Sequence, residues 1–139
     1  MNAYEKFRFV SIVALLFLAV GAFGGGFWLI ADPSGAALKI PLELLENTPF
    51  NNYLIPGILL FFANGVLSLG IAILAIKRAK YYPRLITLQG CILIGWLIVE
   101  ALMNTEFVHP GLHYPLLAIG VLLIVSSFVV EKERLINAV

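Results

Sequence analysis

The chain has 139 residues, of which 61% are hydrophobic and only 12% are charged, and its formal net charge is +1. Soluble domains carry about 25% charged residues, so this composition excludes an ordinary soluble globule and indicates an integral membrane protein. The near-neutral charge offers no broad basic field for nucleic acid, and the single cysteine excludes an internal disulfide or a multi-cysteine metal centre.

The first predicted transmembrane helix covers residues 9–31, which contain no charged side chain. Residues 32–35 end it, because they combine a proline, which lacks a backbone N–H, with three residues that favour turns. The apolar run is longer than the core of a signal peptide, which spans about 7 to 15 residues. We therefore expect it to be retained as a membrane span.

The connection to the second span is the longest, and its residues 41–47 begin with a proline and alternate apolar with acidic positions. This pattern predicts a short amphipathic helix at the membrane interface. Leu42 and Leu45 would then face lipid, while Glu43 and Glu46 would face water. An ordinary ordered loop is the alternative.

Three further spans are predicted at about residues 54–76, 83–103 and 114–130. The last has about 17 residues, which is near the lower limit for crossing a hydrocarbon core of about 30 Å. Four spans and short loops use the whole length, so residues 1–139 form one transmembrane domain. The predicted fold class is all-α, a membrane four-helix bundle with a short interfacial helix in the first outer loop.

Lysine and arginine side chains are distributed unevenly between the two sides of this predicted bundle. Of the nine cationic side chains, only Lys39 falls in the first or third connection. Cationic residues bias flanking segments toward the cytoplasm. With an even number of spans, both termini are therefore expected on the cytoplasmic side of a cell membrane.

Glu100 is a carboxylic acid inside the third predicted span. Such a residue costs about 2.5 to 3.5 kcal/mol near the centre of a membrane helix, so it should not face lipid. Two interpretations stay open. Glu100 is either a proton-accepting or ligand-binding group in an outward-facing pocket, or a structural group bonded to a neighbouring helix.

Polar side chains on the second and third spans also follow helical spacing. Gln89 and Trp96 share one face with Glu100, and Asn64 and Ser68 form a stripe on the preceding span. A hydrogen bond from Gln89 to Asn64 or Ser68 is the plain expectation. The candidate ligand-binding residues are Glu100, Trp96, Gln89, Asn64 and Phe61.

His109 and His113 have a spacing that could bind a metal on a regular helix, but Pro110 and Gly111 lie between them. We therefore expect both histidines to lie on a loop surface. No catalytic or cofactor-binding sequence motif occurs, so we expect no metal site and no cofactor, and the sequence favours a protein without enzymatic activity while leaving an enzyme as an alternative.

Several short signals together resemble small uncharacterised four-helix bacterial membrane proteins, broadly similar to the DoxX-like group. The signals are residues 32–35, 48–50, 53–57, 64–65 and 95–96 together with Glu100. The resemblance implies a multi-pass protein of the bacterial inner membrane. Some DoxX relatives are implied to be subunits of quinone-linked oxidoreductases, but no residue here matches such a site, so that activity is not carried over.

The sequence thus favours a structural or accessory component of the bacterial cytoplasmic membrane, in contact with lipid and with a second copy or a partner membrane subunit. One alternative is a membrane enzyme or redox subunit that binds a quinone or lipid in a cavity lined by Phe61, Trp96 and Glu100. Another is transport of protons or small cations through Glu100, which needs a continuous polar path.

Overall fold

The computed structural model describes residues 1–138, and within them every regular element is a helix. Four helices are long and apolar enough to cross a membrane, which confirms the predicted all-α four-helix fold. They are α1 (Ala3–Ala31), the continuous helix Leu54–Ile76 made of α2 (Leu54–Leu59), η3 (Leu60–Val66) and α3 (Leu67–Ile76), α4 (Tyr82–Met103), and α5 (Pro110–Asn137). Short 3₁₀ helices lie in the connections: η1 (Ala36–Leu38), η2 (Leu42–Leu45) and η4 (Thr105–Phe107).

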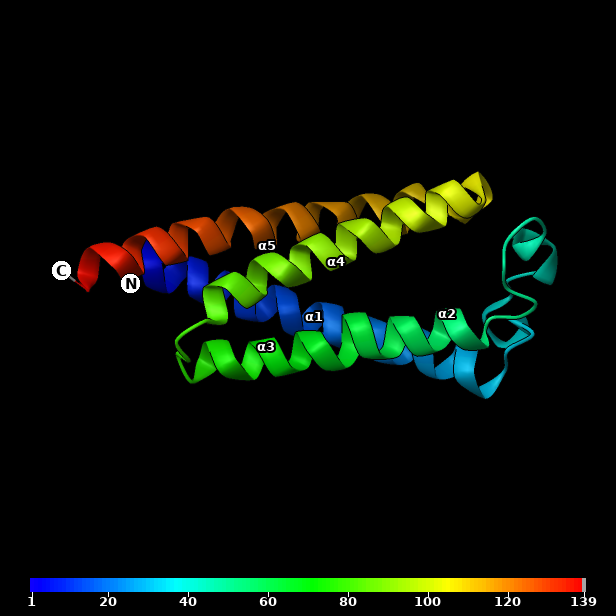
Figure 1. Cartoon of the computed structure of the whole chain (residues 1–139), viewed down its shortest axis with the longest axis horizontal. Helices are drawn as coiled ribbons and strands as arrows, with labels where there is room; N and C mark the ends of the chain where they lie inside the picture. Colours follow the sequence, from blue (N-terminus) through cyan, green and yellow to red (C-terminus); the bar gives the residue numbers. More distant parts are fainter. Residues whose placement is uncertain (139) are drawn as a thin grey trace.

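The helices form two packed pairs that diverge toward one end (Figure 1). α4 lies along α5, and α1 lies along the helix Leu54–Ile76. Both termini and the turn 77–81 lie at one end of the molecule, here called the termini end, and residues 32–53 and 104–109 lie at the opposite end, here called the loop end. The pairs meet near the termini end, whereas α4 stands away from α2 near the loop end.

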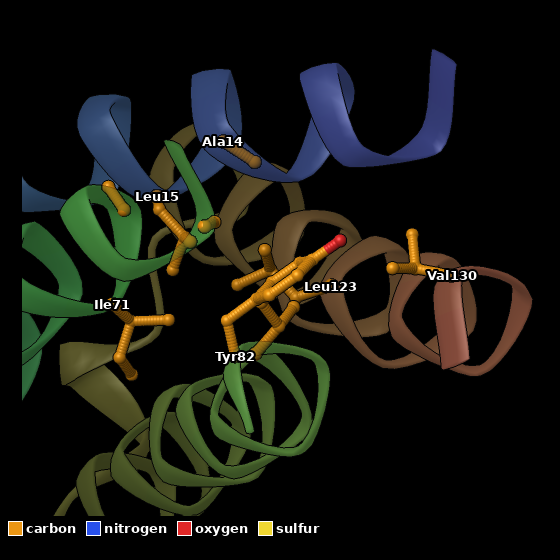
Figure 2. Packing of buried hydrophobic residues seen from close by; sticks show 9 residues of the cluster. Ala14, Leu15, Ile71, Tyr82, Leu123 and Val130 are labelled. Carbon is orange, nitrogen blue, oxygen red and sulfur yellow. The ribbon is translucent and has the colours of Figure 1, made fainter. Parts of the chain in front are cut away.

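The closely packed core lies toward the termini end. Figure 2 shows the ring of Tyr82 among side chains from several helices. The labelled neighbours are Ala14, Leu15, Ile71, Leu123 and Val130. The hydroxyl groups of Tyr82 and Tyr4 are 2.6 Å apart, and those of Ser11 and Ser126 are 2.7 Å apart. Such interhelical hydrogen bonds contribute about 0.6 to 2 kcal/mol each in membranes, so they reinforce the packing at this end.

α1 and the second transmembrane helix approach each other through glycines near the loop end. A Cβ atom added to Gly26 would lie 2.7 Å from the Cβ of Phe61, and one added to Gly57 would lie 2.7 Å from the Cβ of Leu29. The absence of a side chain at both glycines therefore allows the two backbones to touch.

The first outer loop contains a short helix, but one of its leucines does not face lipid. The segment forms the 3₁₀ helix Leu42–Leu45, and Leu42 is exposed. The prediction for Leu45 is wrong, because this side chain is only 4% exposed and packs against Leu29 and Tyr53. The physical reason is that the Tyr53 hydroxyl bonds the Pro41 carbonyl, which holds this segment against the helix ends and turns Leu45 toward Leu29.

α5 begins earlier and ends later than the fourth predicted span. It starts at Pro110 and includes Gly111 and His113, so the predicted break between the two histidines is wrong. The physical reason is position: Pro110 and Gly111 occupy the first turn, where backbone N–H groups have no partner within the helix. His109 is the residue that precedes the helix.

Candidate functional site

An apolar pocket lies at the loop end, in the gap between α4 and the pair formed by α1 and α2. Its cavity volume is about 120 Å³. The walls come from three of the four transmembrane helices, namely α1, the helix Leu54–Ile76 and α4, and from the loop segments that cover them. They include Leu29, Leu45, Phe50, Tyr53, Pro56, Leu60, Trp96, Val99, Glu100, Met103 and Phe107. Glu100 is the one acidic or basic side chain among the lining residues, so a single carboxylate meets an otherwise apolar cavity.

Tyr53 fixes the loop that covers this pocket. Its backbone N–H donates to the Pro33 carbonyl at 2.9 Å, and its hydroxyl donates to the Pro41 carbonyl at 2.7 Å. The side chain is almost fully buried, and burial, with a smaller effect of the Glu43 charge, raises the pKa of its phenol above the ordinary value. The ring of Tyr53 therefore forms part of the pocket wall, and its hydroxyl holds the loop in place over the pocket.

Substitution Tyr53→Phe should loosen the covering loop without changing the shape of the pocket wall. The Pro41 carbonyl would lose its donor, which costs about 1 to 2 kcal/mol when the group stays shielded from water. We expect amide hydrogen exchange in residues 36–53 to accelerate roughly tenfold, since about 1.4 kcal/mol corresponds to one factor of ten. Tyr81→Phe, which alters an exposed tyrosine at the termini end, is the control. Equal exchange in both variants would show that the hydroxyl does not hold the loop.

Asp32 holds the start of the same loop. Its carboxylate accepts hydrogen bonds from the Ser34 hydroxyl at 2.6 Å and from the backbone N–H of Ala37 at 3.0 Å. These bonds, with that of the Ser34 hydroxyl the largest, lower the pKa of Asp32 below its ordinary value. The ionised form therefore stabilises the turn directly after α1.

Acid should loosen this turn. A carboxyl whose pKa is depressed by folding contributes stability above its unfolded pKa, of about 3.9, and loses that contribution as the pH falls through the folded value. We expect hydrogen exchange at Ala37, corrected for its intrinsic pH dependence, to increase as the pH drops below about 4. In Asp32→Asn the pH dependence should be absent. A profile that is identical in the two proteins would refute the role of Asp32.

Glu100 pairs with His113 across the α4–α5 interface. The Oε2 atom of Glu100 is 2.9 Å from Nε2 of His113, and the imidazole is only 8% exposed. The expectation that His113 lies on a loop surface is therefore wrong, whereas His109 is exposed. The first turn of α5 carries His113 into the bundle, where it faces the one acidic side chain of α4. The sequence alone did not identify this pair.

The spacing of Glu100 and His113 along the sequence could have predicted their contact. Helices joined by a short turn run antiparallel, so residues equally far from the turn lie at the same depth. Glu100 lies four residues before Asn104, and His113 lies four residues after His109, at the two limits of the connection 104–109. Because Pro110 was interpreted as a helix end, the equal distances of Glu100 and His113 from the turn did not lead to a predicted contact.

Gln89 and Asn64 form a second buried polar cluster, away from the pocket. The amide nitrogen of Gln89 donates to Oδ1 of Asn64 and to the carbonyl oxygen of Ala63, each at 3.2 Å. The predicted Gln89–Asn64 hydrogen bond is thus present. Asn64 lies in the π-helical segment Leu60–Val66, and Gln89 lies on α4. Ser68 is also fully buried. π-Helical turns are frequent where a helix must present groups outside the regular pattern.

The five candidate residues therefore occupy three places. Trp96 and Glu100 line the pocket, Gln89 and Asn64 form the polar cluster, and Phe61 packs against Phe23 at the α1 crossing, with ring centroids 4.9 Å apart. Along α4, Leu93 and Leu97 lie between Gln89 and Glu100, and both pack with Leu18 of α1 in a buried apolar cluster. This apolar cluster separates the two groups of polar side chains.

Within residues 1–138 no group of three or more His, Cys, Asp or Glu side chains is placed to hold a metal ion. No model of a known protein family, no curated protein and no solved structure matches the chain. Its class rests on the fold itself. The chain is a multi-pass membrane protein built as a four-helix bundle, and the wall of its loop-end pocket carries a carboxylate paired with a histidine.

Proposed function

We propose that this protein binds a lipophilic molecule in the loop-end pocket. The observation that carries the proposal is an apolar cavity with a single carboxylate in its wall, held in place by His113. Small-molecule sites have this composition: mostly apolar walls with few polar groups that fix orientation. This site supports the lipid- or quinone-binding alternative from the sequence more directly than it supports the structural or accessory role. For that role, the small size of the fold is the main support.

Transport through Glu100 has less support. A conduction path needs a continuous series of polar or hydrated positions. The apolar cluster of Leu18, Leu93 and Leu97 interrupts such a series between Glu100 and Gln89. The proposal is therefore a binding site that opens toward the loop end.

The proposed location is a bacterial cytoplasmic membrane, as the resemblance to DoxX-like proteins implies, with both termini in the cytoplasm and the pocket in the outer half. The support is the charge pattern: the termini end carries eight of the nine cationic side chains. In a Cys91→Ala background, Ser34→Cys should react with a membrane-impermeant maleimide in intact cells. Lys132→Cys should react only after lysis, and the reverse pattern would invert the topology.

Native mass spectrometry of the protein, gently extracted from its own membrane, tests the binding. We expect a retained small lipophilic molecule in the wild type and its loss in Val99→Trp, which fills the pocket from its half-exposed wall. Ile98→Trp adds the same side chain to a neighbouring residue outside the pocket lining and should retain the molecule. If no molecule is retained in the wild type, or if both variants keep it, the pocket is not the binding site.

A further inference from the structure

The hydrogen bonds of His113 determine its protonation state. The backbone N–H of His109 donates to Nδ1 of His113 at 3.1 Å. A nitrogen that accepts a hydrogen bond carries no proton, so the neutral imidazole has its proton on Nε2. That N–H then donates to Oε2 of Glu100. His113 therefore holds and orients the carboxylate but supplies no positive charge to balance it.

No lysine or arginine side chain within residues 1–138 lies in ion-pair range of Glu100. The side chain of Glu100 is 27% exposed and lines the cavity. Its carboxylate has two oxygens and can accept several hydrogen bonds, of which His113 provides one. The pocket therefore presents a hydrogen-bond acceptor that is negatively charged when it is ionised, inside walls that are otherwise apolar.

Aromatic rings complete the surroundings of this carboxylate. Trp96, Tyr53 and Phe107 line the same cavity, and the faces of such rings attract cations. The surface of the loop end has the same preference. It carries Asp32, Glu43, Glu46 and Glu106 but only one basic residue, Lys39, so its field draws cations toward the pocket.

We propose that the ligand is a lipophilic amine: a small molecule with one protonated amino group that binds Glu100 and an apolar, preferably aromatic, body that fills the cavity. The inference rests on the binding function proposed above and specifies its ligand class. A protonated amine supplies the positive charge that His113 does not, and it adds hydrogen-bond donors to the one that His113 provides. A quinone, in contrast, offers only carbonyl acceptors, which do not bind a carboxylate, and the N–H groups of His113 and Trp96 near Glu100 both interact with that carboxylate.

Three probes of nearly the same size separate charge from hydrogen bonding and from apolar contact. They are 3-phenylpropylamine, which is protonated at neutral pH, the alcohol 3-phenyl-1-propanol, and the hydrocarbon butylbenzene. Binding is measured in uncharged maltoside micelles by the fluorescence of Trp96, in full-length protein carrying Trp28→Phe. Trp28 is the other tryptophan and is half exposed outside the pocket lining, so the substitution leaves one reporter in the wall.

We expect a saturable response to the amine with an affinity roughly tenfold or more above that of the alcohol and the hydrocarbon. Glu100→Gln should remove this preference, whereas Glu106→Gln, an exposed carboxylate at the same end, should keep it. The comparison of the three probes needs no change at Glu100, so it stands even if the Gln variant folds poorly.

Equal affinity for all three probes would overturn the amine inference and leave the apolar binding site intact. Equal affinity for amine and alcohol, both above the hydrocarbon, would replace a charge requirement with a hydrogen-bond donor. If no probe produced a saturable response, both the ligand class and the binding function would be wrong. If phosphatidylethanolamine added to the micelles displaced the amine and this depended on Glu100, the occupant would be a lipid headgroup and not a small amine.

Discussion

Substitution of Gly26 with alanine is expected to destabilise the folded bundle by about 2 to 3 kcal/mol, the upper part of the range for an overpacked core. The added Cβ would lie 2.7 Å from the Cβ of Phe61 and 2.9 Å from both its Cα and its backbone N. A side-chain rotation cannot relieve contacts with backbone atoms. α1 and the second transmembrane helix would have to separate at the crossing that also supports the pocket.

Unfolding of the purified protein in mixed micelles of maltoside and dodecyl sulfate measures this effect. The matched control is Gly24→Ala, because an added Cβ at Gly24 meets no atom within 4 Å. It should unfold at the wild-type detergent fraction or slightly above it, since alanine favours a helix over glycine by up to about 1 kcal/mol. Equal stability of the Gly26 and Gly24 variants would contradict a close approach of the two helices at Gly26.

The contrast between these two glycines also shows how far the sequence predicts the fold. Length and composition identify four membrane helices, because a hydrocarbon core of about 30 Å demands about 20 apolar residues from each. The twelve glycines give no comparable signal, because each is permitted in a membrane helix whether or not it packs. Which of them touches a neighbouring helix depends on how each helix is rotated about its axis. The spans are apolar on all sides and have no clear polar face from which that rotation could be predicted.

Part of the candidate site was predictable for a similar reason. Glu100 stands out because a carboxylic acid is costly at membrane depth, and Gln89 and Asn64 stand out because buried amides require partners. Phe61 was harder to place. The expected faces assumed a regular α-helix, whereas the helix is π-helical over Leu60–Val66, and Phe61 lies in this stretch and packs against α1. His113 was missed because proline and glycine can start a helix as well as end one.

Substitutions in the Glu100–His113 pair, which the sequence analysis did not identify, should lower stability by different amounts at the two positions. Replacing His113 with leucine leaves the Glu100 carboxylate at membrane depth without its hydrogen-bond donor. We expect a loss of about 1 to 2 kcal/mol, less than for a fully buried pair because the Glu100 side chain is 27% exposed. Glu100→Leu should cost less, since the imidazole that remains is neutral.

A double-mutant cycle in the same mixed micelles separates the pair from its surroundings. The variant with both leucines should be about as stable as Glu100→Leu alone, because the cost of losing His113 arises from the unpartnered carboxylate and disappears with it. His109→Leu serves as the control, since His109 is exposed and its backbone N–H is unchanged by the substitution. If His113→Leu cost no more than His109→Leu, the 2.9 Å contact would contribute little to stability, and the orientation of Glu100 in the pocket wall would have to come from α4 itself.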